Sequence, residues 1–430
     1  MKRSMFALAA FGLALGSNAS GEPMAMSITK DILLMPGELT DPTSINATPD
    51  GQLIVTADWW GKNAAISTPA WPGPTPAVAI KFDQTGEVAW TYRWEKHSPE
   101  PRHPVIYIAG SAVLPGGEIL LCGNDAAGDG SDREEKDVRS AQFITLGADG
   151  KLIEERSFMP AAKPDPDSQL SLISGIEKCG RWGDGAFALG SAVRIFPNQK
   201  DAAYPGRTKG EYLLWLIRTD ARGQIAWEKL IPTTAGPHFD FSPPQVVANG
   251  DLVFSTTDFD RQSAAADHRS TILTAVGPDG SIRTQSKFAG TSPMVSRADP
   301  AQPILLALVN SDPAQDATLL TLDAKLAIVK QQTIPLSAYL GRRFHLHGAD
   351  RLVAFRDTDE QARRSPNASE YDLREGKVER LPLPSRSGDR YAITDFITLD
   401  KPGTFAVLRH RYPPNAGNRP AIGVTLVELK

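Results

Sequence analysis

Acidic, histidine and arginine side chains recur in the long polar segments of this sequence, and together they can carry acid–base chemistry. A carboxylate or an imidazole can take a proton from a substrate or return it when it lies within hydrogen-bonding reach. The residues concerned are Asp258, Asp260, Arg261, His268, Asp357, Asp359, Arg409 and His410. If the fold gathers them, the set would suit a hydrolase or a lyase.

The same segments are rich in aromatic and arginine side chains, the residue types on which protein interfaces depend most. Trp59, Trp60 and Trp71 share one segment with several prolines, which would stiffen it and lower the ordering cost of binding. The predicted binding residues are Trp59, Trp60, Trp71, Arg194, Tyr204, Asp258, Arg261, Arg356, Asp357, Arg409 and His410. A second interpretation is that the tryptophans fold back onto their own proline-rich loop as a small core.

Motifs that would specify a reaction are not found in the sequence. It has no G-x-S-x-G, H-E-x-x-H, Walker or dinucleotide-binding pattern. The acidic segment 125–137 fits no established calcium loop, and His345 with His347 are too few for a zinc site unless another segment adds a ligand. We therefore expect neither a metal nor a cofactor. Binding is favoured over catalysis, and an enzyme stays open as the alternative.

The segments that must position these residues follow a repeat. A β-rich run, a tight polar turn and a second β-rich run return at 77–94, 141–158, 212–231, 271–288, 318–334 and 369–381. Five of the turns hold a glycine where a hairpin needs a positive φ, namely Gly86, Gly150, Gly223, Gly280 and Gly376. A second hairpin, with turns such as PDG at 49–51 and PGG at 115–117, precedes each. Two hairpins form a four-stranded antiparallel sheet, the unit of a β-propeller blade.

The repeats predict an all-β protein, a seven-bladed β-propeller in a single domain of residues 27–430. We expect the blades at about 41–94, 105–158, 171–231, 241–288, 289–334, 340–382 and 390–430. The last unit supplies only three strands, and residues 27–35 form a lone strand. This N-terminal strand should complete the last blade and close the ring, leaving no open sheet edge. Six or eight blades stay open, since the units at 290–334 and 341–381 are the weakest.

Residues 81–90 (KFDQTGEVAW) and 218–227 (RTDARGQIAW) share an aspartate, a turn glycine and a tryptophan. They resemble the tryptophan-docking repeat of the PQQ-like propellers, within the wider group of PQQ-like and WD-repeat-like β-propellers. In that repeat these three residues join neighbouring blades, so the resemblance implies the propeller fold. Quinone enzymes of this group rely on adjacent cysteines, and the chain has no such pair.

Cys122 and Cys179 are the two cysteines of the chain. In an oxidising compartment an even pair indicates a disulfide, and both residues fall on inner strands of neighbouring predicted blades. The alternative is two buried thiols that pack as small hydrophobic side chains.

The first nineteen residues have the pattern of a secretory signal peptide. Lys2 and Arg3 precede the apolar run 5–15, and small residues follow at 17–19. The run is too short to span a bilayer, so we expect a soluble periplasmic or secreted protein, monomeric and without a membrane span. The net charge of −4 and the lack of a basic cluster argue against nucleic acid as a partner.

In a four-stranded blade the two hairpin turns share one face, and the remaining connections share the other. Here the second group is long: 58–76, 124–140, 191–211, 256–270, 356–368 and 409–420. Function concentrates on loops that a rigid scaffold displays. We therefore expect an exported module that engages another periplasmic or secreted protein, as an envelope scaffold or as an inhibitor or immunity-type protein. The alternative is a propeller hydrolase or lyase acting on a sugar, ester or peptide at the channel mouth.

Overall fold

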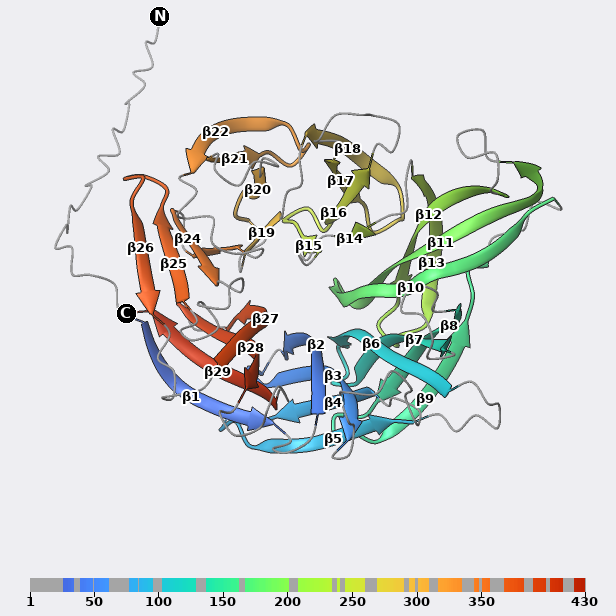
Figure 1. Cartoon of the computed structure of the whole chain (residues 1–430), viewed down its shortest axis with the longest axis horizontal. Helices are drawn as coiled ribbons and strands as arrows, with labels where there is room; N and C mark the ends of the chain where they lie inside the picture. Colours follow the sequence, from blue (N-terminus) through green and yellow to red (C-terminus); the bar gives the residue numbers. More distant parts are fainter. Residues whose placement is uncertain are drawn as a thin grey trace, which may run out of the picture.

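The computed structural model is a ring of seven β-sheet blades around a central axis (Figure 1). It describes residues 26–429 apart from 35–38, 49, 62–76, 84, 96–102, 129–136, 162–166, 201–207, 234–237, 240–243, 260–268, 290–293, 298–300, 309–315, 335–343, 348–349, 356–366, 383–389, 400–402 and 413–420. Every element among these residues is a strand, so none of them forms a helix that could cross a membrane. The predicted seven-bladed, all-β fold is confirmed.

The first three blades are four-stranded antiparallel sheets whose strands follow one another from the axis to the rim. Blade 1 consists of β2 (Leu39–Ala47), β3 (Leu53–Gly61), β4 (Ala77–Phe82) and β5 (Val88–Trp94). Blade 2 consists of β6 (His103–Val113), β7 (Ile119–Gly128), β8 (Asp137–Leu146) and β9 (Leu152–Phe158). Blade 3 consists of β10 (Gln169–Trp182), β11 (Gly185–Lys200), β12 (Thr208–Thr219) and β13 (Ile225–Thr233).

Blades 4 to 6 vary this plan at their innermost strands. In blade 4 that strand is split into β14 (His238–Phe239) and β15 (Gln245–Val246), followed by β16 (Leu252–Phe259), β17 (Arg269–Val276) and β18 (Ile282–Ala289). Blade 5 consists of β19 (Met294–Arg297), β20 (Ile304–Leu308), β21 (Ala317–Leu322) and β22 (Ile328–Ile334). Blade 6 consists of β23 (Phe344–His347), β24 (Arg351–Phe355), β25 (Asn367–Asp372) and β26 (Val378–Pro382). A short parallel pairing of β19 with β23 joins these two blades at the axis.

Blade 7 is built from both ends of the chain. It consists of β27 (Arg390–Thr398), β28 (Thr404–Tyr412) and β29 (Ala421–Leu429), with β1 (Met26–Leu34) as its outermost strand. The antiparallel pairing of β1 with β29 runs from Met26↔Leu429 to Leu34↔Ile422. Figure 1 shows the two strands side by side at the rim. The expected closure of the ring by the N-terminal strand is confirmed.

The hydrophobic core lies between blades rather than in one central mass. Among the described residues, seven clusters of buried apolar side chains each draw on two neighbouring blades. The cluster at the closing point joins Ile45 and Val55 of blade 1 to Leu408 and Val424 of blade 7. Because burial of apolar surface is the main favourable term in folding, each blade is held chiefly by its two neighbours.

Tryptophans of the outermost strands dock onto the next blade, as the resemblance implied. Trp90 on β5 donates to the carbonyl of Ala148 at 3.0 Å, and Trp227 on β13 donates to that of Pro278 at 2.9 Å. The ring of Trp90 covers Gly150 so closely that a Cβ there would lie 2.6 Å from it. The tryptophan therefore requires glycine in the facing turn.

Where the tryptophan is absent, another side chain makes the same bridge. Arg156 on β9 donates to the carbonyl of Gly223 and, at 2.7 Å, to Gln224 in the turn of blade 3. At the closing point Lys30 and Ile32 of β1 cover Gly86 of blade 1 in the same way. The contact between outermost strand and neighbouring turn is thus kept while the residue type changes.

Candidate functional site

The antiparallel order of the strands gives the ring two different ends. The turns that join the first strand to the second, and the third to the fourth, lie at one end, here named the short-turn end. The connections from the second strand to the third and from blade to blade leave from the other, here named the long-connection end. This is the division expected from the sequence, and it follows from the pairings of all seven blades.

The predicted binding residues fall into three groups by what the structure describes of them. Both backbone and side chain are described for Arg194 and Arg409. The strand backbone alone is described for Trp59 and Trp60 on β3, Asp258 on β16 and His410 on β28. The predictions for Trp71, Tyr204, Arg261, Arg356 and Asp357 lie outside the described residues.

The residues that can be placed lie in the halves of second strands that lead to the long connections. β3 and β28 are the second strands of blades 1 and 7, which are neighbours in the ring. Their ends toward the long connections carry Trp59 with Trp60, and Arg409 with His410. Arg194 and Asp258 lie on β11 and β16, the second strands of neighbouring blades 3 and 4. The fold therefore brings these residues to the long-connection end in two groups.

Arg409 binds the strand that closes the ring. Its side chain is only 5% exposed and its guanidinium forms an ion pair with Asp31 of β1. The hydroxyl of Thr425 on β29 donates to the same carboxylate oxygen at 3.1 Å. Arg409 thus connects the second and fourth strands of blade 7 across β29.

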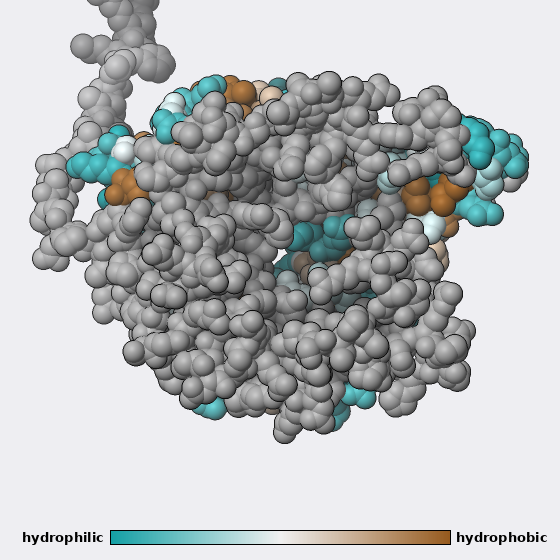
Figure 2. Space-filling model, in the orientation of Figure 1, coloured by the Kyte–Doolittle hydropathy of each residue, from teal (hydrophilic) through white to brown (hydrophobic). Residues whose placement is uncertain are grey.

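Arg194 lies on a hairpin that reaches beyond the body of the ring. β11 continues to Lys200, and its partner β12 begins at Thr208, so most of the segment expected to be a loop is strand. Figure 1 shows this hairpin projecting from blade 3. β11 and β12 pair in register from Phe187↔Arg218 to Phe196↔Lys209, and after a shift in register Lys200 pairs with Thr208. Hydrophobic and hydrophilic side chains adjoin there in Figure 2.

Side chains on the projecting hairpin are fixed by local pairs. The guanidinium of Arg194 lies 2.7 Å from the carboxylate of Glu211 on the facing strand. The ammonium of Lys209 lies 5.0 Å from the ring centre of Phe196 and donates to Gln199 at 3.1 Å. The side chains of 193–196 are half-buried, and those of 197–200 are exposed.

The disulfide prediction is confirmed. Cys122 on β7 and Cys179 on β10 are bonded, with Cα atoms 6.1 Å apart and a sequence separation of 57. The bond joins blade 2 to blade 3. Next to it, Asn124 of β7 accepts from the amide of Ile176 at 2.7 Å and donates to its carbonyl at 2.8 Å.

His345 and His347 lie on β23, the innermost strand of blade 6, as expected. His345 is buried, and its ring centre lies 5.4 Å from that of Phe405 in blade 7. Burial, with a smaller contribution from His347, lowers the pKa of His345 to about 4. The imidazole is therefore neutral at physiological pH and packs as part of the interface between these blades. In the described part of the chain no three histidine, cysteine or acidic residues are grouped as metal ligands would be.

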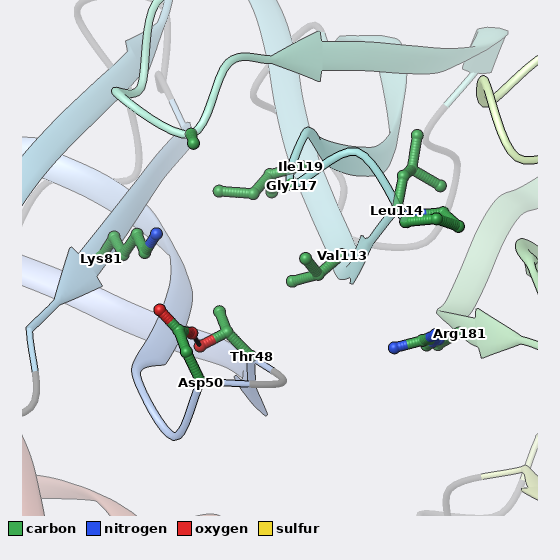
Figure 3. A pocket seen from close by; sticks show the side chains of 10 residues that line it. Thr48, Asp50, Lys81, Val113, Leu114, Gly117, Ile119 and Arg181 are labelled. Carbon is green, nitrogen blue, oxygen red and sulfur yellow. Dashed lines mark hydrogen bonds between the residues drawn. The ribbon is translucent and has the colours of Figure 1, made fainter.

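A pocket that the sequence did not indicate opens at the short-turn end (Figure 3). It has a volume of about 450 Å³. It is lined by Thr48, Asp50, Lys81, Val113, Leu114, Pro115, Gly117, Ile119, Ala148 and Arg181. These residues come from turns and strand ends of blades 1, 2 and 3. Since each turn is unremarkable alone, no local pattern could have predicted the site.

Charged side chains stand on opposite sides of this pocket. Figure 3 shows Asp50 and Lys81 on one side and Arg181 on the other, with Val113 between them. The hydroxyl of Thr48 donates to the carboxylate of Asp50. This hydrogen bond, helped by the charge of Lys81, holds the pKa of Asp50 below its usual value. Asp50 is therefore ionised at neutral pH.

Comparison with solved structures finds similar chains at low sequence identity. It superposes on a polysaccharide lyase named Uly1 with a TM-score of 0.52 and 8% identity, covering 93% of this chain and 99% of that one. A protein of unknown function from Dyadobacter fermentans gives a TM-score of 0.46 at 12% identity, covering 94% and 100%. The β-propeller domain of the Trilobed protease from Pyrococcus furiosus gives 0.48 at 10%, covering 90% and 93%.

Sequence comparisons do not assign the chain to a protein family. No protein-family model matches the chain, and no curated protein sequence matches it either. At 8% identity the likeness to the polysaccharide lyase concerns the fold alone. What the strands and their pairings establish is that the chain is a seven-bladed β-propeller.

Proposed function

We propose that the protein is an exported binding module that engages another protein through its long-connection end. It would act as an envelope scaffold or as an inhibitor or immunity-type protein. The observation that carries the proposal is the projecting hairpin of β11 and β12, which extends a surface of paired strands away from the ring. A surface that is ordered before binding loses less entropy when a partner arrives.

The composition of this hairpin suits a protein partner. Val193, Ile195 and Phe196 are half-buried apolar side chains, flanked by the Arg194–Glu211 pair and by Lys209. Interfaces combine an apolar centre with a polar rim in this way. Trp59 and Trp60, at the same end of blade 1, would add aromatic anchors.

Export is supported by the Cys122–Cys179 disulfide, because such bonds persist in oxidising compartments and are rare in the cytosol. Together with the signal-peptide pattern of residues 1–19, it favours the periplasm or the medium. Mass measurement of the protein recovered from these fractions tests this, and we expect a chain that begins at Ser20. Recovery of the full-length chain from the cytosol alone would contradict export.

The binding proposal is tested with substitutions at the long-connection end. The wild-type protein is used to isolate partners from envelope extract, and each candidate is then purified for affinity measurements. Trp59→Ala/Trp60→Ala and Ile195→Ser/Phe196→Ser should each weaken binding by about ten-fold or more, the loss typical of interface anchors. The control is Lys325→Gln, an exposed cation in a turn at the short-turn end, which should bind like wild type.

The proposal fails if every purified partner binds the two variants as tightly as the wild-type protein. Loss of binding in Lys325→Gln as well would show that the effect does not belong to the long-connection end.

A further inference from the structure

The pocket at the short-turn end has cations that the rest of the described chain does not neutralise. Among the described residues no ion pair of Lys81 or Arg181 is found. The charge of Lys81 nevertheless lowers the pKa of Asp50. The guanidinium of Arg181 donates at 3.2 Å to a backbone carbonyl, that of Gly183. With Asp50 ionised, the pocket carries two positive charges and one negative charge.

The wall between these charges is apolar. Val113, Pro115 and Ala148 supply accessible aliphatic surface along blade 2, while Leu114 and Ile119 in the same lining are buried. A volume of about 450 Å³ is within the range of pockets that hold small organic molecules. A ligand that fits must therefore have an apolar body and an excess of negative charge.

We propose that this pocket binds a small organic anion that lies between Lys81 and Arg181, with its apolar body against the aliphatic wall of blade 2. The site is at the opposite end of the ring from the proposed protein-binding surface, so the two can be tested separately. The turns that form it are held by hydrogen bonds. In the turn of blade 1 the amide of Gln52 donates to Thr48 at 2.9 Å, and in blade 2 the amide of Gly117 donates to the carbonyl of Leu114 at 2.9 Å. The pocket is therefore largely formed before a ligand binds.

The test uses a pair of fluorescent probes that share one aromatic body. Anilinonaphthalene sulfonate carries a negative charge, and phenylnaphthylamine is its uncharged counterpart. We expect saturable binding of the sulfonate at one site on the wild-type protein. Lys81→Gln and Arg181→Gln should each weaken it by about three- to ten-fold, as expected for contacts that water partly screens. Binding of phenylnaphthylamine should change little in these variants.

Asp50→Asn should strengthen binding of the sulfonate rather than weaken it. The amide keeps an oxygen that can accept from Thr48, but the negative charge beside the anion is lost. The sulfonate should then bind about two- to three-fold more tightly, a gain that damage to the fold would not produce. Lys325→Gln, a remote cation at the same end of the ring, is the control and should leave both probes unaffected.

Ala148→Trp tests the position of the site without altering charge. An indole at this exposed turn position would fill the pocket, so binding of both probes should be lost while circular dichroism shows an intact fold. The proposal is overturned if the sulfonate does not bind saturably or if neither cation matters. It is also overturned if phenylnaphthylamine weakens as much as the sulfonate in Lys81→Gln and Arg181→Gln, because the site would then not be selective for anions.

Discussion

Arg409 and Asp31 show how a single pair of side chains ties distant parts of the chain together. Their charged groups meet across 378 residues of sequence, with the guanidinium almost completely buried. A buried charge that loses its partner retains the cost of its desolvation. The contribution of the pair to stability should therefore be largest when only one of the two residues is removed.

Arg409→Met should lower the free energy of unfolding by about 3 kcal/mol, because Asp31 is left without its partner beside Thr425. The double variant Arg409→Met/Asp31→Asn should recover part of this loss, since the unpaired charge is gone as well. Urea denaturation followed by tryptophan fluorescence measures both. A double variant less stable than Arg409→Met would show that the residues do not act as a pair.

His345 should make the interface between blades 6 and 7 sensitive to acid. The imidazole titrates near 6.5 in the unfolded chain and at a pKa of about 4 in the folded protein, so between these values the unfolded state binds more protons. The free energy of unfolding should fall as pH drops through this window, by up to about 3 kcal/mol. Denaturation at neutral pH and at about pH 5 should show a smaller difference for His345→Gln than for wild type. An equal difference in both proteins would place the acid sensitivity elsewhere.

At the scale of strands and turns, blades are joined by contacts that repeat in position but not in residue type. Trp90 and Trp227 dock on glycine turns, Arg156 takes that role between blades 2 and 3, and Lys30 with Ile32 takes it at the closing point. The corresponding turn of blade 5 has Leu326 at a φ of 59°. Leu326 adopts this left-handed conformation, and its side chain is buried between blades 4 and 5.

Gly150→Ala should be more destabilising than the same change at Gly376. Both glycines have positive φ, 80° and 70°, so each substitution costs about 1–2 kcal/mol in backbone strain. At Gly150 the new methyl group would also collide with Trp90, whereas at Gly376 its nearest neighbour lies at 3.8 Å. We expect an additional loss of about 2 kcal/mol at Gly150. Thermal unfolding compares the two, and equal melting temperatures would contradict close docking of the tryptophan.

The disulfide between β7 and β10 should contribute measurably to stability. Opening a loop of this length gives the unfolded chain more freedom, and Cys122→Ala/Cys179→Ala should cost about 4 kcal/mol by the chain-entropy estimate. Reduction of the wild-type protein should lower its denaturation midpoint toward that of the variant. If reduction has no effect on the midpoint, the bond does not restrain the unfolded chain.

The elements that could be predicted from the sequence are those determined by the conformational preferences of neighbouring residues. Turn glycines such as Gly86 and Gly150 need a positive φ that the residue itself permits, so hairpins and blade number could be inferred from spacing. The extension of β11 to Lys200 was not foreseen, because its polar and charged residues look like a loop until their pairing with β12 is known. The pocket depends on three blades packing side by side, and the docking role of Arg156 depends on two. No local sequence pattern marks the pocket or the docking of Arg156. The docking of Trp90 and Trp227, in contrast, is marked by the shared aspartate, glycine and tryptophan.

For the whole molecule, stability is distributed over seven interfaces of similar construction. The cluster between blades 7 and 1 is as completely buried as the others, although it joins the two ends of the chain. Any two neighbouring blades therefore depend on each other, and loss of one interface opens the ring.

The pairing of β1 with β29 also sets the order in which parts of the fold can form during synthesis. β1 is made before its partner, which follows roughly 390 residues later, a wait of about 20–80 s at ordinary rates of synthesis. During that time β1 has no strand to pair with, and its backbone is open to any other chain with an unpaired edge. A newly made molecule would therefore need protection from aggregation by a holding chaperone until β29 has been made.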